Sequence, residues 1–240
     1  MRIVIVIAGV ALLVLAGVFV PCFLEGGEVP GGSGYSLLSP IRSGNLTVFP
    51  VVAGKSYDTA QFLTLDEGLR SGEVVIAEAG QVQGMIRRRP GDHPIPIHDN
   101  AQVNRLVLVN NSSRPLLLLA GEIVSGGKKD RVIGKDRIVP AESDPVDLSV
   151  FCVEPGRWVA TSGKYNFSAG GIGGNGLLAA PGVRSKVMAE KDQQQVWANV
   201  AKARTAMSEN VMVEAGTPRV SEGTTSYARV MDNKDVQKQV

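Results

Sequence analysis

Side chains with acid, base and thiol groups concentrate between residues 122 and 158 of this 240-residue chain. On an extended strand, Leu118, Ala120 and Glu122 face the same way, so Glu122 ends an apolar row. A carboxylate in that place needs a partner, because an unpaired buried charge is costly. On a second predicted strand, Cys152 and Glu154 share one face. Six more charged side chains crowd the turn between the two strands: Lys128, Lys129, Asp130, Arg131, Lys135 and Asp136.

The residues alone leave two interpretations of this cluster open. In the first, it is a buried ion-pair network in which Glu122 or Glu154 pairs with Arg131 or Arg157. In the second, it binds an anionic small molecule, with the arginines clamping the anion and Glu122 or Glu154 acting as acid or base. The candidate ligand-binding residues are Lys128, Asp130, Arg131, Arg157 and Trp158.

Cys152 is a further candidate for a catalytic group, as a nucleophile. Its thiolate would need a nearby cation or base, which Arg157 or a histidine supplies only if the fold brings it close. Phe151 and Val153 flank the thiol, and a cysteine in such a run is more often buried and inert. The second cysteine, Cys22, lies in an apolar leader, so we expect no intrachain disulfide.

Glycine-rich and histidine motifs predict neither a cofactor nor a bound metal. Residues 171–176 match the spacing G-x-G-x-x-G, but no predicted strand precedes them and no helix opens at the third glycine. The segment GEIVSGGK at 121–128 is one residue too long for a phosphate loop and lacks a Ser or Thr after its lysine. His93 and His98 have aspartate neighbours, but the prolines between them favour extended backbone that separates the two rings.

The charge balance argues against a nucleic-acid partner. Lys and Arg total 25 against 23 Asp and Glu, and Arg2 belongs to the leader, so the globular part is close to neutral. The one basic run, 87–89, stands beside Pro90 and Gly91 and is typical of a solvated loop.

The N-terminus predicts a membrane-inserting helix. Residues 3–24 form an uncharged apolar run of 22 residues, which as a helix reaches roughly 33 Å and can span a bilayer. Arg2 precedes the run and Glu25 follows it, so the positive-inside rule places Met1 in the cytoplasm. We therefore expect a cell-membrane protein whose domain lies on the extracytoplasmic side.

A cleaved signal peptide and a lipoprotein signal on Cys22 stay open beside this uncleaved anchor. The residue before a lipidated cysteine is normally Gly or Ala, but here it is Pro21. No clear A-x-A cleavage site follows the apolar run. Cleavage would make the domain secreted or periplasmic. Residues 25–36 are expected to be a flexible linker and 37–240 a single β-rich domain. The segment 225–240 opens a helix and ends without a cap, which suggests a truncated C-terminus.

Short β-type runs separated by turn residues predict an α+β fold with a mostly antiparallel, sandwich-like core. The segment 106–124 predicts a hairpin whose loop is 110–114, because loop residues there tolerate left-handed backbone. Leu116–Leu119 are apolar on both faces, so that strand should be covered on both sides. The runs are LTVFPVV from Leu46, VVIAEA from Val74, NRLVLVN from Asn104, PLLLLAGEIV from Pro115 and DLSVFCVE from Asp147.

One or two packing helices are expected in the C-terminal third. Apolar side chains recur at helical spacing between Asp192 and Met207, and Asp192 is a candidate N-cap. A shorter helix is predicted over 65–70, with Thr64 as its N-cap. The Gly, Ala and Ser composition of 165–182 predicts a mobile loop over a cleft instead of a packed element.

Six motifs follow one another in an order that a known family shares. They are NLTVFP at Asn45, TLDEGL at Thr64, the strand ending in Glu78, LLLLAGEIVSGGKKDR at 116–131, IVP at Ile138 and FCVEPGRW at 151–158. Over about residues 37–160 the chain resembles the bacterial domain family named for its association with ADP-ribosylglycohydrolase and rhodanese-phosphatase proteins. Where that family usually has glutamine before Asp130, this chain has Lys129, which puts a ligand contact of that side chain in doubt.

The resemblance implies a family whose biochemical role is not established and whose neighbourhood is ADP-ribose or phosphoester metabolism. The family usually continues beyond the point where this chain ends. We therefore hypothesise a membrane-anchored or exported ligand-binding or interaction module. The alternative is an enzyme that acts on an ADP-ribose-like, nucleotide or phosphorylated ligand, and a purely structural role comes third.

Overall fold

The computed structural model describes residues 34–79, 103–156, 167–171, 174–215 and 224–238. The chain forms two compact units that divide after Asp58. The predicted membrane-inserting leader, 3–24, lies outside the described residues. Within the described ranges, no helix combines the length and the apolar character needed to cross a bilayer.

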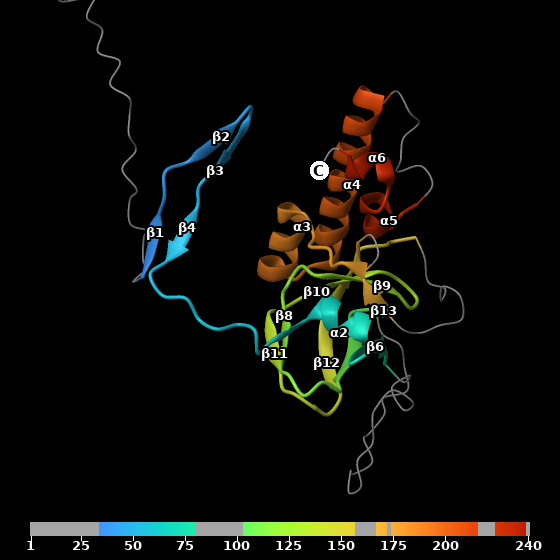
Figure 1. The fold of residues 1–240 in the computed structure, drawn as a ribbon. Helices are drawn as coiled ribbons and strands as arrows, with labels where there is room; N and C mark the ends of the chain where they lie inside the picture. Colours follow the sequence, from blue (N-terminus) through green and yellow to red (C-terminus); the bar gives the residue numbers. More distant parts are fainter. Residues whose placement is uncertain (1–33, 80–102, 157–166, 172–173, 216–223, 239–240) are drawn as a thin grey trace, which may run out of the picture. The chain divides into compact units, whose positions relative to one another are not determined.

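The first unit contains a narrow antiparallel ribbon made of two strand pairs in series (Figure 1). We call residues 34–54 the ribbon. The single strand predicted from Leu46 is two strands, because Pro50 has no N–H to donate to a ladder. Gly44, in the turn at the tip, has a φ of 54°, which favours glycine. The strands are β1 (Tyr35–Leu37), paired with β4 (Val51–Ala53), and β2 (Ile41–Ser43), paired with β3 (Leu46–Val48).

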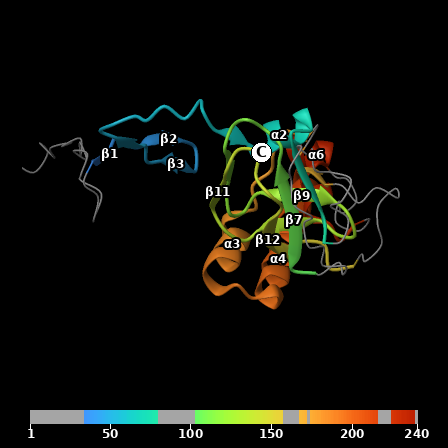
Figure 2. The ribbon, with the colours of Figure 1, turned by 90° about the horizontal axis from the view of Figure 1, so that it is seen from below.

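The second unit is built on a six-stranded antiparallel sheet in the order β13-β9-β10-β12-β7-β6. The strands are β6 (Val74–Glu78), β7 (Arg105–Asn110), β9 (Ile123–Gly126), β10 (Arg131–Ile133), β12 (Val146–Cys152) and β13 (Phe167–Ala169). The sheet coils until its edge strands β13 and β6 are in contact, so it is a nearly closed barrel (Figures 1 and 2). The α+β class and the antiparallel core are confirmed. The sandwich-like arrangement is wrong, because these short, twisted strands coil into one nearly closed layer.

A three-stranded sheet accompanies the barrel. Its middle strand, β8 (Leu116–Leu118), pairs in parallel with β5 (Leu63–Thr64) and antiparallel with β11 (Arg137–Val139). One core joins this sheet to the barrel strands, and alternate strand residues contribute to it, as the pleat requires. Its members include Leu63, Val74, Ile76, Leu106, Leu108, Leu116, Leu118, Val124, Ile133, Val139, Leu148 and Val150.

Helices form a second core with other residues of the barrel strands. Val132, Phe151 and Val153 pack with valines of the C-terminal helices. The helix predicted from Asp192 is confirmed and longer than expected, and the Asp192 carboxylate accepts the N–H groups of Gln194 and Gln195. The helices are α3 (Pro181–Ser185), the π-helix η2 (Lys186–Glu190), α4 (Gln193–Ala215), α5 (Tyr227–Met231) and α6 (Lys234–Gln237).

The hairpin predicted over 106–124 is wrong. β7 pairs with β6 and β12, whereas β8 belongs to the other sheet. The reason lies in Asn110, whose buried side-chain amide donates to the carbonyl oxygens of Arg114 and Pro140, at 3.0 and 2.9 Å. Its side-chain oxygen accepts the N–H of Ser112. These bonds form a corner at which the chain leaves one sheet for the other.

Two predictions for shorter segments have opposite outcomes. The helix expected over 65–70 is confirmed as α2 (Leu65–Ser71), and the N–H of Thr64 donates to the Glu67 carboxylate as in a capping box. The segment 165–182 is not one loop, because its residues 167–169 form β13 against β9. Phe167 and Ala169 are buried there, so the glycines around them conceal an inward-facing strand.

Candidate functional site

A buried ion pair joins β10 to the end of β6. Arg131 Nη2 lies 3.7 Å from Glu78 Oε1, and the two side chains are 0% and 1% exposed. Glu78 follows Val74 and Ile76 on one face of β6, so an apolar row ends in a carboxylate. Arg131 thus has a buried carboxylate partner, Glu78, which the sequence analysis did not name as its partner.

The turn between β9 and β10 wraps around the same carboxylate. The backbone N–H of Lys128 donates to Glu78 Oε1 at 2.9 Å. Gly127 has a φ of 48°, and a Cβ at this position would lie 2.8 Å from Glu78 Oε1 and 2.4 Å from the Phe167 ring. Only glycine fits there. The Gly126–Gly127 turn thus serves a contact with an internal carboxylate.

The guanidinium of Arg131 makes further contacts inside the protein. Its Nε donates to the carbonyl oxygen of Val103 at 2.9 Å, and its Nη1 donates to that of Lys129 at 2.6 Å. A guanidinium enclosed in this way is closed to a ligand. These contacts favour the structural interpretation of Arg131.

Asp130 connects the same turn to the C-terminal helices. Its carboxylate accepts the N–H of Gly126 at 3.1 Å and the hydroxyl of Ser226, the N-cap of α5. Its own N–H donates to Glu154 Oε2 at 3.1 Å. Asp130, Glu154 and Ser226 are all buried. Two of the predicted site residues therefore lie together, and they hold the barrel to the helical layer.

The remaining predicted ligand-binding residues are only partly described. Lys128 is half-buried, while Arg157 and Trp158 lie outside the described residues. Lys129, which stands where the resembling family usually has glutamine, donates to the carbonyl oxygen of Pro155 at 3.2 Å. Its ammonium also lies 5.9 Å from the ring centroid of Trp197, within cation–π range.

Cys152 lies directly opposite Arg131 in the β10–β12 register and is fully buried. Burial raises the pKa of its thiol above the ordinary value, although Arg131 and Lys129 act in the other direction. The side-chain amide of Gln193 holds both backbone groups of Cys152, accepting its N–H at 2.9 Å and donating to its carbonyl oxygen at 3.0 Å. A protonated, enclosed thiol is a poor nucleophile.

Glu122 does not join this network through its strand neighbours. Its backbone carbonyl accepts the N–H of Ile133, whereas Arg131 faces Val124 across the ladder. Its Oε2 accepts the N–H of Leu119 at 2.7 Å. Burial, with smaller contributions from the nearby carboxylates of Asp66 and Asp136, raises the pKa of Glu122 to about 7. We call Asp66, Glu122 and Asp136 the carboxylate cluster.

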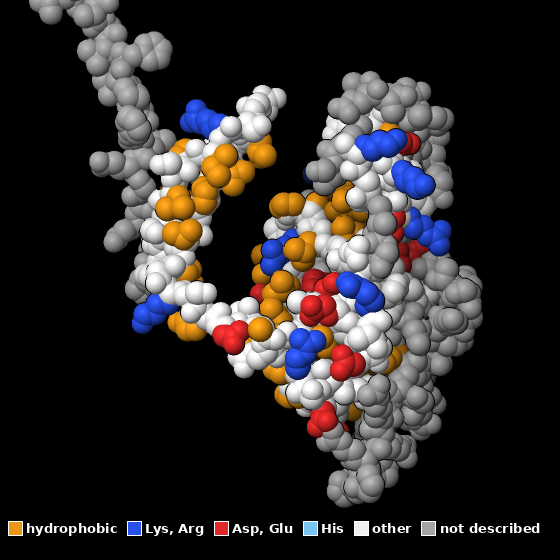
Figure 3. Space-filling view, viewed as in Figure 1, with side chains coloured by type: hydrophobic (Ala, Val, Ile, Leu, Met, Phe, Trp, Pro, Cys, Tyr) orange, Lys and Arg blue, Asp and Glu red, His pale blue; other side chains and the backbone are white. Residues whose placement is uncertain are grey.

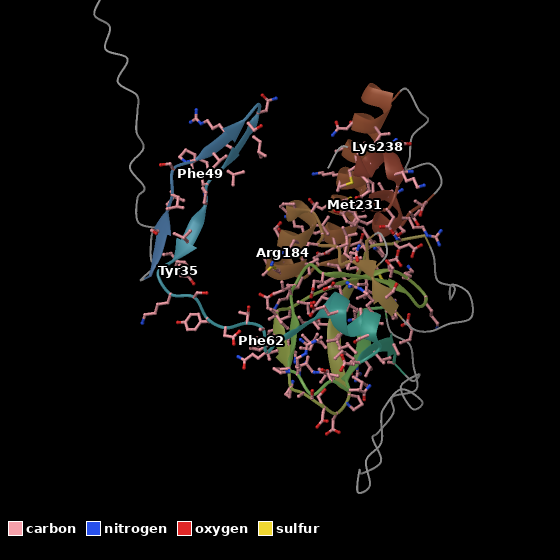
Figure 4. All side chains as sticks on the ribbon, in the orientation of Figure 1. Tyr35, Phe49, Phe62, Arg184, Met231 and Lys238 are labelled. Carbon is pink, nitrogen blue, oxygen red and sulfur yellow. The ribbon has the colours of Figure 1, made fainter. Side chains whose placement is uncertain are left out.

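Arg184 of α3 and Asp136 hold the bend that carries Glu122. Arg184 Nε donates to the carbonyl oxygen of Ala120 at 2.8 Å, and the N–H of Ala120 donates to Asp136 at 2.6 Å. The side chain of Arg184 is labelled in Figure 4. Gly121 has a φ of 96°, and a Cβ there would lie 2.9 Å from the Arg184 side chain. The bend therefore requires glycine, and Glu122 has a fixed position.

An open pocket of about 340 Å³ lies beside α2. Its lining residues are Leu69, Arg70, Ser168, Ala169, Gly171 and Gly174. The side chain of Arg70 is about half exposed, and its guanidinium pairs with Asp66 at 2.7 Å. A Cβ on Gly176 would lie 3.6 Å from that of Asp66, so the glycine-rich segment runs past the same carboxylate. Asp66 thus pairs with an arginine of the pocket lining and also belongs to the carboxylate cluster.

Sequence reasoning missed Glu78, Arg70 and Ser168. For Glu78 the signal was present, because Val74, Ile76 and Glu78 repeat the pattern that singled out Glu122. For Arg70 and Ser168 there was no local signal. Within the described ranges, no three His, Cys, Asp or Glu side chains are arranged to hold a metal ion, and the two histidines lie outside those ranges.

A family model matches residues 34–240, that of the ARG and Rhodanese-Phosphatase-superfamily-associated Protein domain, ARPP-1. The chain belongs to this family. The match confirms the resemblance found in the sequence and extends it to the C-terminal helices. No curated protein and no solved structure matches the chain.

Replacing Glu78 by Gln should destabilise this ARPP-1 domain by roughly 3 kcal/mol, because it removes the opposite charge beside a buried guanidinium. Urea unfolding of Glu78→Gln and wild type measures the difference. The matched control is Asp147→Asn, which makes the same chemical change in the exposed Arg105–Asp147 pair and should cost less than about 1 kcal/mol. Equal losses in the two variants would contradict the structural role of the buried pair.

Glu122 should make the ARPP-1 domain less stable as the pH rises. Its pKa is about 7 in the folded chain against an ordinary 4.5, so folding favours the protonated form. No penalty exists below pH 4.5, and the penalty grows to roughly 3 kcal/mol as the pH rises through 7. Glu122→Gln should therefore gain stability relative to wild type between pH 4.5 and 8 in urea unfolding. Glu209→Gln, on the exposed surface of α4, is the control, and a pH-independent difference for Glu122→Gln would refute the assignment.

Proposed function

We propose that this ARPP-1 domain is a ligand-binding module, anchored in a membrane by its N-terminal segment, and that it binds a small anionic molecule in the pocket beside α2. The observation that carries the proposal is the placement of Arg70. Its guanidinium borders an open cavity of about 340 Å³, a size within the range of small-molecule sites. Arg131, one of the candidate ligand-binding cations of the sequence analysis, is 0% exposed.

The pocket lining supports an anionic ligand. A guanidinium presents several N–H donors in one plane and suits carboxylate and phosphate oxygens. Asp66 holds Arg70 through a single pair at 2.7 Å, which orients the group while leaving it about half exposed. Gly171 and Gly174 of the lining have positive φ values of 92° and 72°. Backbone without a Cβ allows a ligand to approach closely.

The membrane placement rests on the sequence of residues 2–25. An uncharged run of 22 residues preceded by Arg2 and followed by Glu25 is typical of an N-in, C-out anchor. If the leader is cleaved, the same domain is secreted or periplasmic. In both cases the domain works on the extracytoplasmic side.

An enzyme acting on an ADP-ribose-like, nucleotide or phosphorylated ligand is the second candidate. Glu122 favours it, because a pKa of about 7 suits a general acid or base at neutral pH. Asp66 connects Glu122 to the pocket, because its carboxylate contributes to the raised pKa of Glu122 and also pairs with Arg70 of the pocket lining. Burial of Cys152 and its raised thiol pKa make it the weakest of the catalytic candidates.

Ligand binding can be tested by thermal melting with ADP-ribose, nucleotides and sugar phosphates. A ligand at about 100 times its Kd should stabilise wild type by about 2.7 kcal/mol. Arg70→Gln should lose that stabilisation while keeping its fold, because an exposed i,i+4 pair contributes only about 0.4 kcal/mol. Arg137→Gln, at an exposed arginine of β11, is the control. A flat response of wild type across the panel would remove the proposal of an anionic ligand.

The enzyme hypothesis adds one requirement to this experiment. Glu122→Gln should still be stabilised by the ligand but should leave it intact on prolonged incubation, while wild type converts it. If chromatography shows that wild type also leaves the ligand unchanged, turnover of the panel compounds is excluded and the binding-module hypothesis remains.

The placement of the domain can be tested with a reporter that is active only outside the cytoplasm, fused after Gly34. We expect activity, because the leader should carry everything after Glu25 across the membrane. The same reporter behind a leader with two arginines inserted into 3–24 is the control and should be inactive. A cytoplasmic reporter that is active at this position would contradict the orientation.

A further inference from the structure

The ribbon exposes an unusual amount of apolar surface for two short strand pairs. Figure 3 shows hydrophobic side chains distributed along it. Ile41 and Leu46 are 63% and 62% exposed, and Tyr35, Phe49 and Val51 each exceed half. Apolar surface of this kind on a folded unit marks an interaction site. A two-stranded ribbon is also marginally stable in water by itself, so a covering partner would stabilise it.

The register of the ribbon separates apolar from polar side chains within each strand pair. In the β2–β3 pair, Ile41 faces Val48 and Leu46 shares their face, whereas Arg42 faces Thr47 on the opposite side. Leu46 and Thr47, although adjacent in the sequence, therefore lie on opposite faces of the ribbon. This part of the ribbon is amphipathic.

The charges on the ribbon identify the kind of partner. From Gly34 to Tyr57 the sequence has no Asp or Glu, and its only charged side chains are Arg42 and Lys55. The same segment carries three aromatic side chains, Tyr35, Phe49 and Tyr57, all exposed. Apolar and aromatic groups combined with basic side chains are typical of segments that lie in the interface of an anionic bilayer. A second copy of the ribbon would bring like charges together.

The short connection between the leader and the ribbon agrees with a bilayer as the partner. The apolar run ends at Leu24, and nine residues, 25–33, precede Gly34. Fully extended, nine residues reach at most roughly 30 Å. A leader inserted in a bilayer therefore keeps the ribbon close to the surface of the same bilayer. This step rests on the proposed membrane anchoring.

We propose that the ribbon lies on the outer surface of the bilayer that holds the leader, with Ile41, Leu46 and Val48 in the lipid interface. Arg42, on the other face, and Lys55, which follows the ribbon, would then lie among anionic headgroups. Lipid would then cover these apolar side chains.

The test uses the full chain, with Cys22→Ala, reconstituted into vesicles of equal parts phosphatidylcholine and phosphatidylglycerol. Leu46→Cys and the matched control Thr47→Cys each receive an environment-sensitive fluorophore, while the native Cys152 is buried. At position 46 we expect a blue shift of the emission and loss of most of the fluorescence to spin-labelled lipid. At position 47 we expect quenching by aqueous iodide. Adding Arg42→Gln and Lys55→Gln, or omitting phosphatidylglycerol, should reduce the lipid quenching at position 46.

The outcomes separate this proposal from the anchoring on which it rests. Extraction of the full chain from the vesicles by alkaline carbonate would overturn the anchor itself. A retained protein whose label at 46 is as open to iodide as that at 47 would overturn the ribbon proposal alone. A label at 46 that is protected from iodide but not quenched by lipid, with protection increasing with the protein-to-lipid ratio, would identify a second copy as the partner and overturn the lipid contact.

Discussion

Two opposite charges buried among apolar strands constrain much of this fold. Desolvation of Arg131 and Glu78 costs several kcal/mol for each ion, so their remaining polar atoms need internal partners. The carbonyl oxygens of Val103 and Lys129 and the N–H of Lys128 supply such partners. To reach Glu78, the turn must pass so close that position 127 tolerates only glycine. The short β9–β10 connection is thus fixed by electrostatics as much as by hydrophobic packing.

Local order was predictable from the sequence, and the pairing of the elements was not. The alternation of apolar and polar residues in a strand and the capping of a helix depend on residues close together in the sequence. The sequence therefore predicted the strands that end at Glu78 and Asn110 and the helices that start after Thr64 and Asp192. The hairpin over 106–124 failed because the bonds of Asn110 reach Pro140, thirty residues away. The strand at Phe167 was missed because glycines hide two inward-facing side chains.

The candidate site shows the same division between chemistry and placement. A carboxylate at the end of an apolar row indicated a group that needs a partner, and this holds for both Glu122 and Glu78. The sequence could not say that Glu78 would pair with a guanidinium, or that Glu122 would lie near two further carboxylates. Nor could it distinguish Arg131, which the barrel encloses, from Arg70, which borders a cavity. Residue type defines the reactions a group can perform, and the fold decides which of them remain accessible.

The bond from Ser226 to Asp130 joins residues that are 96 positions apart. Ribosomal synthesis proceeds from the N-terminus, so all the barrel strands exist before α5 is made. Until then the carboxylate of Asp130 lacks this hydroxyl. The charged corner of the barrel is therefore completed only by a segment near the C-terminal end of the domain.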